Sequence, residues 1–376
     1  MYKRQAIVGA MRQIEIANPD TLYGVLSMFS SQKWTNKAIL NDSKIRDLIE
    51  HLSKRKLGNK DYPADLMGDA YEILLKKFAD DSKAQAGEFY TPRSVVRLLV
   101  HILDPQPGET VYDPACGSGG MLIEAIRYMH DDSLCCGSIF GQEKNVVNAA
   151  IAKMNLFLHG ASDFNVMQGD TLRDPKILQG GNIAKFDCVI ANPPFSLENW
   201  GATEWSSDKY KRNIYGTPSD SCGDYAWIQH MICSMSSGKG RMAVVMPQGI
   251  LFRGNQEAEI RKQLVESDLI EAVVTLGDKL FYGTGLSPCF LIIRRMKQAH
   301  HSGRILMIDG SKILTQKRAQ NILEENDIDR LYSLYQNYSD EEDYSRIVTL
   351  QEIRDKEYNL SPNRYVVYHK EEIRPY

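Results

Sequence analysis

The sequence of 376 residues lacks several features that would place it in a membrane or outside the cell. It has no apolar run of about 18 residues and no basic N-terminal segment leading into an apolar stretch, so neither a transmembrane helix nor a signal peptide is indicated. Its seven cysteines form no Cys-x-x-Cys pair, and His300 and His301 have no ligand-like partner nearby. A disulfide framework and a zinc site are therefore not indicated either. These absences predict a soluble, cytoplasmic protein without a metal.

An excess of positive charge is also missing. Lys and Arg together number 45 against 48 for Asp and Glu, which leaves a net charge of -3 and a pI of about 6.3. Nucleic-acid binding draws much of its affinity from basic groups that neutralise phosphates. If DNA is the substrate, we expect something besides the overall charge of this chain to help hold it.

The composition itself is that of an ordinary globular chain, with 43% hydrophobic and 25% charged residues. Helical periodicity dominates residues 1–82, whereas strands alternate with helices over residues 83–310. The strands expected at 109–113, 164–168, 186–191, 241–246, 269–276 and 288–293 are mostly apolar on both faces, which favours a parallel sheet covered by helices. We predict a doubly wound α/β domain at 83–310, a helical N-terminal region at 1–82 and a helical C-terminal extension at 311–376.

A glycine-rich turn follows the first strand of the predicted α/β domain. The stretch Asp113-Pro114-Ala115-Cys116-Gly117-Ser118-Gly119-Gly120 lies where that strand gives way to a helix. Glycines let a backbone approach a ligand closely, and open α/β sheets bind small molecules at the carboxyl ends of their strands. The spacing fits poorly with both the dinucleotide fingerprint and the phosphate-binding P-loop. We expect a nucleotide-like cofactor here, with a turn that serves packing alone as the alternative.

Two acidic residues follow the next strands of the predicted sheet. Glu143 would accept hydrogen bonds from both hydroxyls of a ribose, although such a glutamate, taken alone, is more often a surface residue. Asp170, in the stretch Gly169-Asp170-Thr171, would accept from an exocyclic amino group such as adenine N6. Capping of a helix explains Asp170 equally well in isolation.

The segment Asn192-Pro193-Pro194-Phe195 carries the most informative chemistry, and it follows an apolar strand. Prolines lack N–H donors and restrict the backbone, so the amide oxygen of Asn192 and the carbonyl of Pro193 can both face a pocket. The exocyclic amino group of a nucleobase is a weak nucleophile because its lone pair is delocalised into the ring. Two acceptors on its hydrogens favour a pyramidal nitrogen, mainly in the transition state. Phe195 would stack on the base, worth about 1–3 kcal/mol, whereas a plain loop with Phe195 in the core is the alternative.

Taken in order, Phe89-Tyr90-Thr91-Pro92-Arg93, the glycine turn and Asn192-Pro193-Pro194-Phe195 resemble the amino-group DNA methyltransferases. More specifically, the chain resembles the modification (M) subunits of type I restriction-modification systems. The resemblance runs from about Lys44 to Tyr365 and includes segments 68–72, 224–230, 251–254 and 280–285. It implies a Rossmann-like methyltransferase sheet and a prokaryotic enzyme that uses S-adenosylmethionine to form N6-methyladenine in DNA.

The resemblance also implies partners and a role for each motif. A separate specificity (S) subunit would read the DNA sequence, and a second M subunit and a restriction (R) subunit would join the complex. Asn192, Pro193, Pro194 and Phe195 would receive an adenine flipped out of double-stranded DNA, which costs a few kcal/mol. The expected cofactor residues, from the methionine end to the adenine ring, are Glu88, Phe89, Tyr90, Thr91, Pro92, Arg93, Asp113, Gly117, Ser118, Gly119, Gly120, Glu143, Asp170 and Thr171.

Other functions stay open beside this one. A protein-glutamine methyltransferase poses the same lone-pair problem, but its related motif usually ends in Tyr rather than in a residue such as Phe195. N4-cytosine methylation of DNA is excluded less firmly. A non-catalytic, truncated subunit is a further alternative, which the intact Asn192 and Phe195 argue against. Compared with the family, we expect the helical region before Lys44 to be truncated, with contacts to partner subunits missing.

Local basic groups offer a route to DNA despite the acidic pI. Lys209-Tyr210-Lys211-Arg212 lies in a polar, aromatic-rich loop soon after Phe195, and Arg294-Arg295-Met296-Lys297 forms a second group. We expect the first group to flank the DNA channel. A solvated loop without a partner is an equal alternative.

Overall fold

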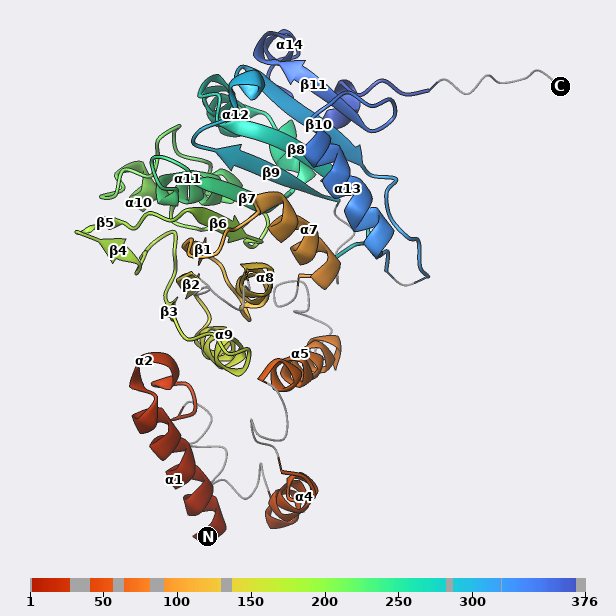
Figure 1. The fold of residues 1–376 in the computed structure, drawn as a ribbon. Coiled ribbons are helices and arrows are strands. Elements are labelled where there is room, and N and C mark those ends of the chain that lie inside the picture. The colour runs from red at the N-terminus through yellow and green to blue at the C-terminus, as the bar shows by residue number, and fades with distance from the viewer. Residues whose placement is uncertain are drawn as a thin grey trace, which may run out of the picture.

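The computed structural model describes residues 2–27, 41–56, 64–81, 91–129, 137–281, 287–318 and 320–369, which build a nine-stranded sheet with helices on both faces (Figure 1). The strands of the sheet are β1 (Val111–Asp113), β2 (Ile139–Glu143), β3 (Phe164–Gln168), β6 (Cys188–Ala191), β7 (Arg241–Pro247), β8 (Ile270–Leu276), β9 (Pro288–Arg294), β10 (Arg304–Gly310) and β11 (Ser345–Thr349). A separate small hairpin pairs β4 (Leu178–Gln179) with β5 (Asn182–Ile183). The predicted α/β sheet is confirmed.

The strand order places a ligand-binding point at the centre of this sheet. The order is β11-β10-β8-β9-β7-β6-β1-β2-β3, and all neighbours are parallel except β9, which is antiparallel to β7 and β8, and β11, which is antiparallel to β10. From β1 the chain continues to β2 and β3 on one side and returns to β6 and β7 on the other. The crevice beyond the carboxyl ends of β1 and β6 is therefore the topological switch point, where such sheets bind ligands.

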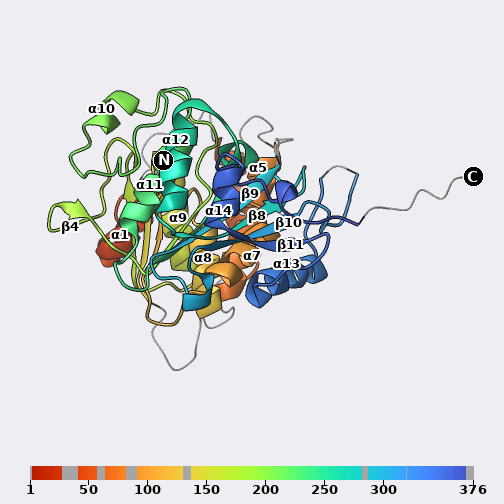
Figure 2. The same cartoon turned by 90° about the horizontal axis from the view of Figure 1, so that it is seen from above.

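Two layers of helices cover the sheet, one on each face (Figure 2). One layer contains α7 (Arg93–Leu103), α8 (Gly120–Met129), α9 (Val146–Leu158) and α13 (Glu325–Asn337), and the other contains α11 (Asp224–Ser234), α12 (Asn255–Glu266) and α14 (Leu350–Asp355). Strand residues alternate between the two buried clusters: on β7, Ala243 and Val245 face the α7 layer, whereas Val244 faces the α11 layer. Because both faces are buried, the strands read as continuous apolar runs.

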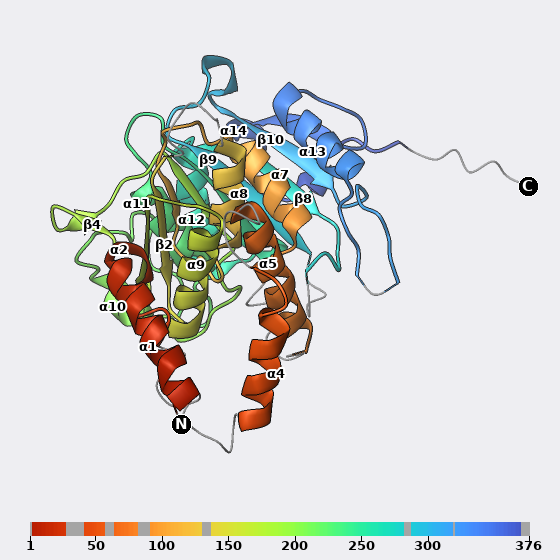
Figure 3. The same cartoon turned by 60° about the horizontal axis from the view of Figure 1, so that its bottom comes forward.

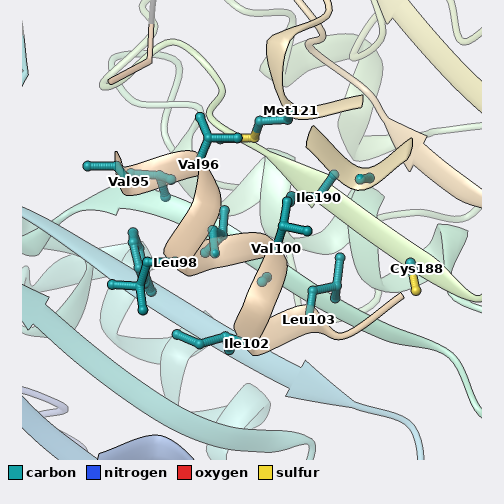
Figure 4. Packing of buried hydrophobic residues seen from close by; sticks show 14 of the residues in the cluster. Val95, Val96, Leu98, Val100, Ile102, Leu103, Met121, Cys188 and Ile190 are labelled. Atoms are coloured by element: carbon teal, nitrogen blue, oxygen red, sulfur yellow. The ribbon is translucent and has the colours of Figure 1, made fainter. Parts of the chain in front are cut away.

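Helix α7 lies directly over the strand that precedes the Asn-Pro-Pro-Phe segment. Its buried side chains, among them Val96, Val100 and Leu103, pack toward Met121 of α8 and toward Ile190 of β6 (Figure 4). The helix also contacts β7. This packing holds the beginning of α7 next to the end of β6, and so brings Thr91, just before α7, close to Asn192, just after β6.

The described part of the N-terminal region is helical, as the sequence predicts, and its helices lie below the sheet in Figure 1. They are α1 (Tyr2–Ala17), α2 (Pro19–Leu22), α4 (Asp42–Leu52) and α5 (Ala64–Asp81). Both α2 and α5 contact α9, while α1 and α4 extend away from the sheet as two arms (Figure 3). Ion pairs attach α5 to the α/β core, because Arg93 pairs with Asp69 and Glu72, and Arg127 pairs with Asp69.

The C-terminal region contains helices, as predicted, and also contributes to the sheet. Helix α13 packs beside α7, and β11 adds an edge strand next to β10. Neither β10 nor β11 was among the strands predicted from the sequence. The remaining elements are short: α10 (Ala202–Ser206) and the 3-10 helices at Gln248–Leu251, Ala299–His301 and Pro362–Arg364. Among the described residues, no helix combines the length and apolarity that crossing a bilayer requires.

Candidate active site

Residues from four strands meet at the switch point. Asp113 ends β1, Glu143 ends β2, Asp170 lies just beyond β3, and Asn192 directly follows β6. The parallel register pairs β1 with both β2 and β6, so these strand ends lie at the same edge of the sheet. The fold thus brings together four motifs that are widely separated in the sequence.

The glycine turn is tied down on both sides. Gly117 and Gly119 have φ values of +53° and +86°, a left-handed conformation that favours glycine. The backbone N–H of Gly117 donates to Glu143 Oε2 at 3.0 Å, which couples the turn to β2. Asp113 is only 2% exposed, and its Oδ1 accepts from the N–H of Ala115 at 2.9 Å. Burial, aided by the nearby Glu143 carboxylate, raises the pKa of Asp113 to about 8.

Asp170 and Thr171 both stabilise the loop after β3. Asp170 Oδ1 accepts from the backbone N–H groups of Leu172 and Arg173 at 3.2 and 3.3 Å, but residues 171–173 form a turn and no helix begins there, so the side chain stabilises a turn and the helix-capping alternative is wrong. Its Oδ2 lies 2.9 Å from Nζ of the exposed Lys144. The Thr171 hydroxyl is buried and donates to the carbonyl of Pro114 at 2.6 Å. Thr171 therefore ties this loop to the glycine turn.

Asn192 has one half of its side-chain amide satisfied and the other half open. Its Nδ2 donates to Thr91 Oγ1 at 2.9 Å. Its Oδ1 is buried, and within the described residues no donor lies within hydrogen-bond distance of it. An unpaired buried acceptor costs about 1–3 kcal/mol, so this oxygen is suited to accept from a ligand. Pro193 is buried and Pro194 is exposed.

Phe195 is half-buried and faces a second aromatic side chain. Its ring centroid lies 6.3 Å from that of Phe281, with an angle of 57° between the ring planes. Phe281 lies just after β8 and was not among the predicted site residues. Its position in segment 280–285 of the resemblance was the signal that could have identified it. Residues 282–285 of that segment lie outside the described residues.

A buried ionic network holds the chain immediately after Phe195. The N–H of Ser196 donates to Asp224 Oδ1 at 2.7 Å, and Asp224, the first residue of α11, is fully buried. Arg253 pairs with Asp224 Oδ2, and its Nε lies 3.2 Å from Glu257 Oε2. Burial raises the pKa of Glu257. The sequence analysis noted segments 224–230 and 251–254 but gave these residues no role.

Some predicted residues are engaged elsewhere. Arg93 is turned toward α5, although the neighbouring Thr91 reaches the site. Arg212 is 1% exposed, pairs with Asp208 and donates to the carbonyls of Thr171 and Leu172. Including Arg212 in a DNA-facing basic group was therefore wrong, because the loop uses this side chain for its own packing. Lys209 and Lys211 are exposed, and the predicted Glu88, Phe89 and Tyr90 lie outside the described residues.

The sequence and the fold also match known proteins. The profile described as N-6 DNA Methylase matches residues 62–373, which is most of the chain. The chain belongs to the N-6 DNA methylase family. It is 38% identical over 342 residues to the type I restriction enzyme MjaVII methylase subunit of Methanocaldococcus jannaschii, a match covering 88% of this chain and 58% of that protein. It is 31% identical to the HindI methylase subunit of Haemophilus influenzae, covering 96% of this chain and 79% of that protein.

A solved structure shares the fold over nearly the whole chain. The crystal structure of the methyltransferase subunit of a type I restriction-modification system from Streptococcus thermophilus superposes with a TM-score of 0.85 at 29% identity, covering 97% of this chain and 77% of that one. The resemblance to type I M subunits is thus confirmed. The chain spans 58%, 63% and 64% of the length of three of the curated relatives it matches.

Proposed function

We propose that the chain is the methyltransferase subunit of a type I restriction-modification system and transfers a methyl group from S-adenosylmethionine to N6 of adenine in DNA. The observation that carries this proposal is the side chain of Asn192. Its Oδ1 is buried, lacks a donor among the described residues and lies at the end of β6, beside the strand that leads into the glycine turn. The related methylase subunits of type I restriction enzymes support the same assignment.

The residues at the strand ends fit S-adenosylmethionine. Apart from its neighbours along the chain, a Cβ at Gly117 or Gly120 would meet no atom of the described residues within 4 Å, so the described part of the chain leaves space beside the turn. The Glu143 carboxylate accepts from the N–H groups of Gly117 and Asn145, and in this proposal it also accepts from a ribose, since a carboxylate has acceptor sites for about four hydrogen bonds. In this proposal Asp170 binds the adenine ring and Thr91 lies at the methionine end. When bound, this cofactor supplies an activated methyl group.

The chain's own contribution is to bind and orient the target base. Asn192 Oδ1 and the Pro193 carbonyl would accept the two hydrogens of the adenine amino group and favour the pyramidal nitrogen whose lone pair can attack. The rings of Phe195 and Phe281 would contact the flipped base and keep it out of the stack. A general base is not needed for the attack, because the nitrogen becomes acidic once it is alkylated.

In the proposed function, this chain binds DNA together with partner subunits. A chain with a net charge of -3 lacks the overall positive charge that grips phosphates. A specificity subunit would read the sequence, and a second M subunit and a restriction subunit would complete the assembly in the cytoplasm of a prokaryote. A structure of the assembling type I system that shares this fold at 26% identity supports an M subunit that works within a complex.

Transfer of labelled methyl groups to DNA tests the proposed function. The chain is assayed with and without a co-expressed specificity subunit, and the methylated nucleosides are identified after digestion. We expect N6-methyladenine, formed only in the presence of the specificity subunit. Recovery of N4-methylcytosine, of methylated glutamine in a protein, or of no product at all would contradict the proposal.

The Asn192→Ala variant locates the chemistry within the site. This change removes the Oδ1 acceptor, so transfer should be abolished, whereas cofactor affinity measured by calorimetry should stay nearly unchanged, since Asn192 is proposed to touch only the base. An equal loss of transfer and cofactor affinity would instead indicate a structural role for Asn192.

A further inference from the structure

We propose that Asp224 is a positioning residue for the methyl-transfer site. It holds the backbone of Ser196 in a left-handed conformation and thereby fixes the direction in which the preceding Phe195 ring projects. This inference rests on the proposed function, because Phe195 is the residue assigned to the target base. Asp224 itself is fully buried beneath the loop and acts only through it.

The chain must turn sharply after Phe195. Ser196 has a φ of +50°, which is uncommon for any residue other than glycine and persists only where the surroundings hold it. Its N–H donates to Asp224 Oδ1 at 2.7 Å, a short bond of the kind that charged acceptors form. A second bond joins the same two segments, from the N–H of Gly223 to the carbonyl of Leu197 at 3.0 Å.

The carboxylate of Asp224 is itself held rigidly. It belongs to the first turn of α11, a helix whose residues 224–232 are all buried. Its Oδ2 pairs with Arg253 and lies 3.3 Å from the thiol of Cys222, while its Oδ1 is left for Ser196. The two oxygens therefore have different roles: Oδ2 is held by Arg253, and Oδ1 holds the backbone of Ser196.

A buried ion pair is a poor device for stability alone. Replacing such a pair with well-packed apolar residues is often neutral or stabilising, because both charges lose their hydration on burial. At this place, however, the Asp224 carboxylate satisfies the N–H of Ser196 in its left-handed conformation. Arg253 then supplies the positive charge that pairs with this buried carboxylate. The network is thus explained by the support that it gives to the left-handed turn at Ser196, directly after Phe195.

Two replacements of Asp224 separate positioning from folding. Asp224→Asn keeps an oxygen that can accept from Ser196, whereas Asp224→Ala removes it. Assayed in the complex with the specificity subunit, the Ala variant should lose about tenfold or more in kcat, as expected when a bond to a charged acceptor is lost. Its cofactor affinity should stay within about twofold, and the Asn variant should retain most of the turnover. If Asp224→Ala alone does not fold, the Asp224→Ala, Arg253→Met, Glu257→Gln triple variant, which removes all three charges of the network, takes its place.

Hydrogen exchange followed by mass spectrometry gives a readout that needs no substrate. The peptide containing Ser196 should exchange faster in the Ala variant than in the Asn variant or the wild type. Unchanged exchange, or faster exchange with a wild-type kcat, would overturn the role of Asp224, and so would an Asn variant as inactive as the Ala variant. A wild type that transfers no methyl group defeats the proposed function instead, and in that case faster exchange in the Ala variant still supports Asp224 as the residue that holds the corner.

Discussion

Removing the hydroxyl of Thr91 should slow methyl transfer without weakening cofactor binding to the same extent. Thr91 Oγ1 accepts a hydrogen bond of 2.9 Å from Asn192 Nδ2, and this bond leaves Oδ1 of the same amide as a buried acceptor with no donor among the described residues. Thr91→Val keeps the shape of the side chain but cannot accept that bond. The Asn192 amide would then be free to rotate, and the acceptor would no longer be held toward the base.

The magnitude follows from the kind of bond that is lost. A hydrogen bond between neutral groups contributes about 0.5–1.5 kcal/mol, and about 1.36 kcal/mol corresponds to a tenfold change in rate. We therefore expect kcat to fall about three- to tenfold in Thr91→Val. The matched control, Thr91→Ser, keeps the hydroxyl and should retain a kcat within about twofold of the wild type.

The assay measures kcat at saturating DNA and cofactor in the complex with the specificity subunit, and cofactor affinity by calorimetry. A wild-type kcat in Thr91→Val would refute the positioning of Asn192 by Thr91. A wild-type kcat accompanied by a large loss of cofactor affinity would show that the hydroxyl serves the cofactor, the role that the sequence resemblance implies for this segment. A Ser variant as slow as the Val variant would assign the effect to the lost methyl group.

Four further changes test other parts of the protein. Because burial raises the pKa of Asp113 to about 8, the folded protein keeps a proton that the unfolded chain releases above about pH 4. The free energy of unfolding should therefore fall with rising pH, by about 1.4 kcal/mol per pH unit between about pH 5 and pH 7. Denaturant titrations of the Asp113→Asn variant at several pH values should lack this contribution to the slope. Asp170→Ala should weaken cofactor binding, which calorimetry would disprove by finding an unchanged affinity. Arg212→Ala should lower the free energy of unfolding by about 3–5 kcal/mol in the same titrations, because it breaks the buried ion pair with Asp208. Replacing the exposed Lys209 and Lys211 should leave stability unchanged and reduce the salt dependence of DNA binding.

The motifs could be read from the sequence because their chemistry depends on local order. A glycine turn after a strand, an acidic residue after the next strand and the Asn-Pro-Pro-Phe segment keep their spacing to the neighbouring apolar runs, so each could be assigned to a strand end before any coordinates. Strand ends of a parallel sheet share one edge, which is why these motifs were expected to meet. The structure confirms that Asp113, Glu143 and Asn192 lie at adjoining strand ends.

Basic and aromatic side chains were harder to place. Arg212 belongs to a basic run whose sequence is typical of a solvated loop. Its side chain is nevertheless buried, because it pairs with Asp208, four residues earlier, and donates to two backbone carbonyls. Phe281 lies in the segment after β8 and Phe195 in the segment after β6, and nothing in either local sequence indicates the other. β11 is short and partly polar because it lies at the edge of the sheet, so its alternation was too weak to predict a strand.

The sequence by itself determined the α/β fold class, the family and the order of the motifs, since apolar periodicity and motif spacing depend only on the order of residues along the chain. Only the tertiary structure decided which side chains act together. The bond between Thr91 and Asn192, the pairing of Phe195 with Phe281 and the support of Ser196 by Asp224 join residues from separate elements. Such contacts depend on how α7, β6 and α11 pack against one another, and no local pattern in the chain encodes that geometry.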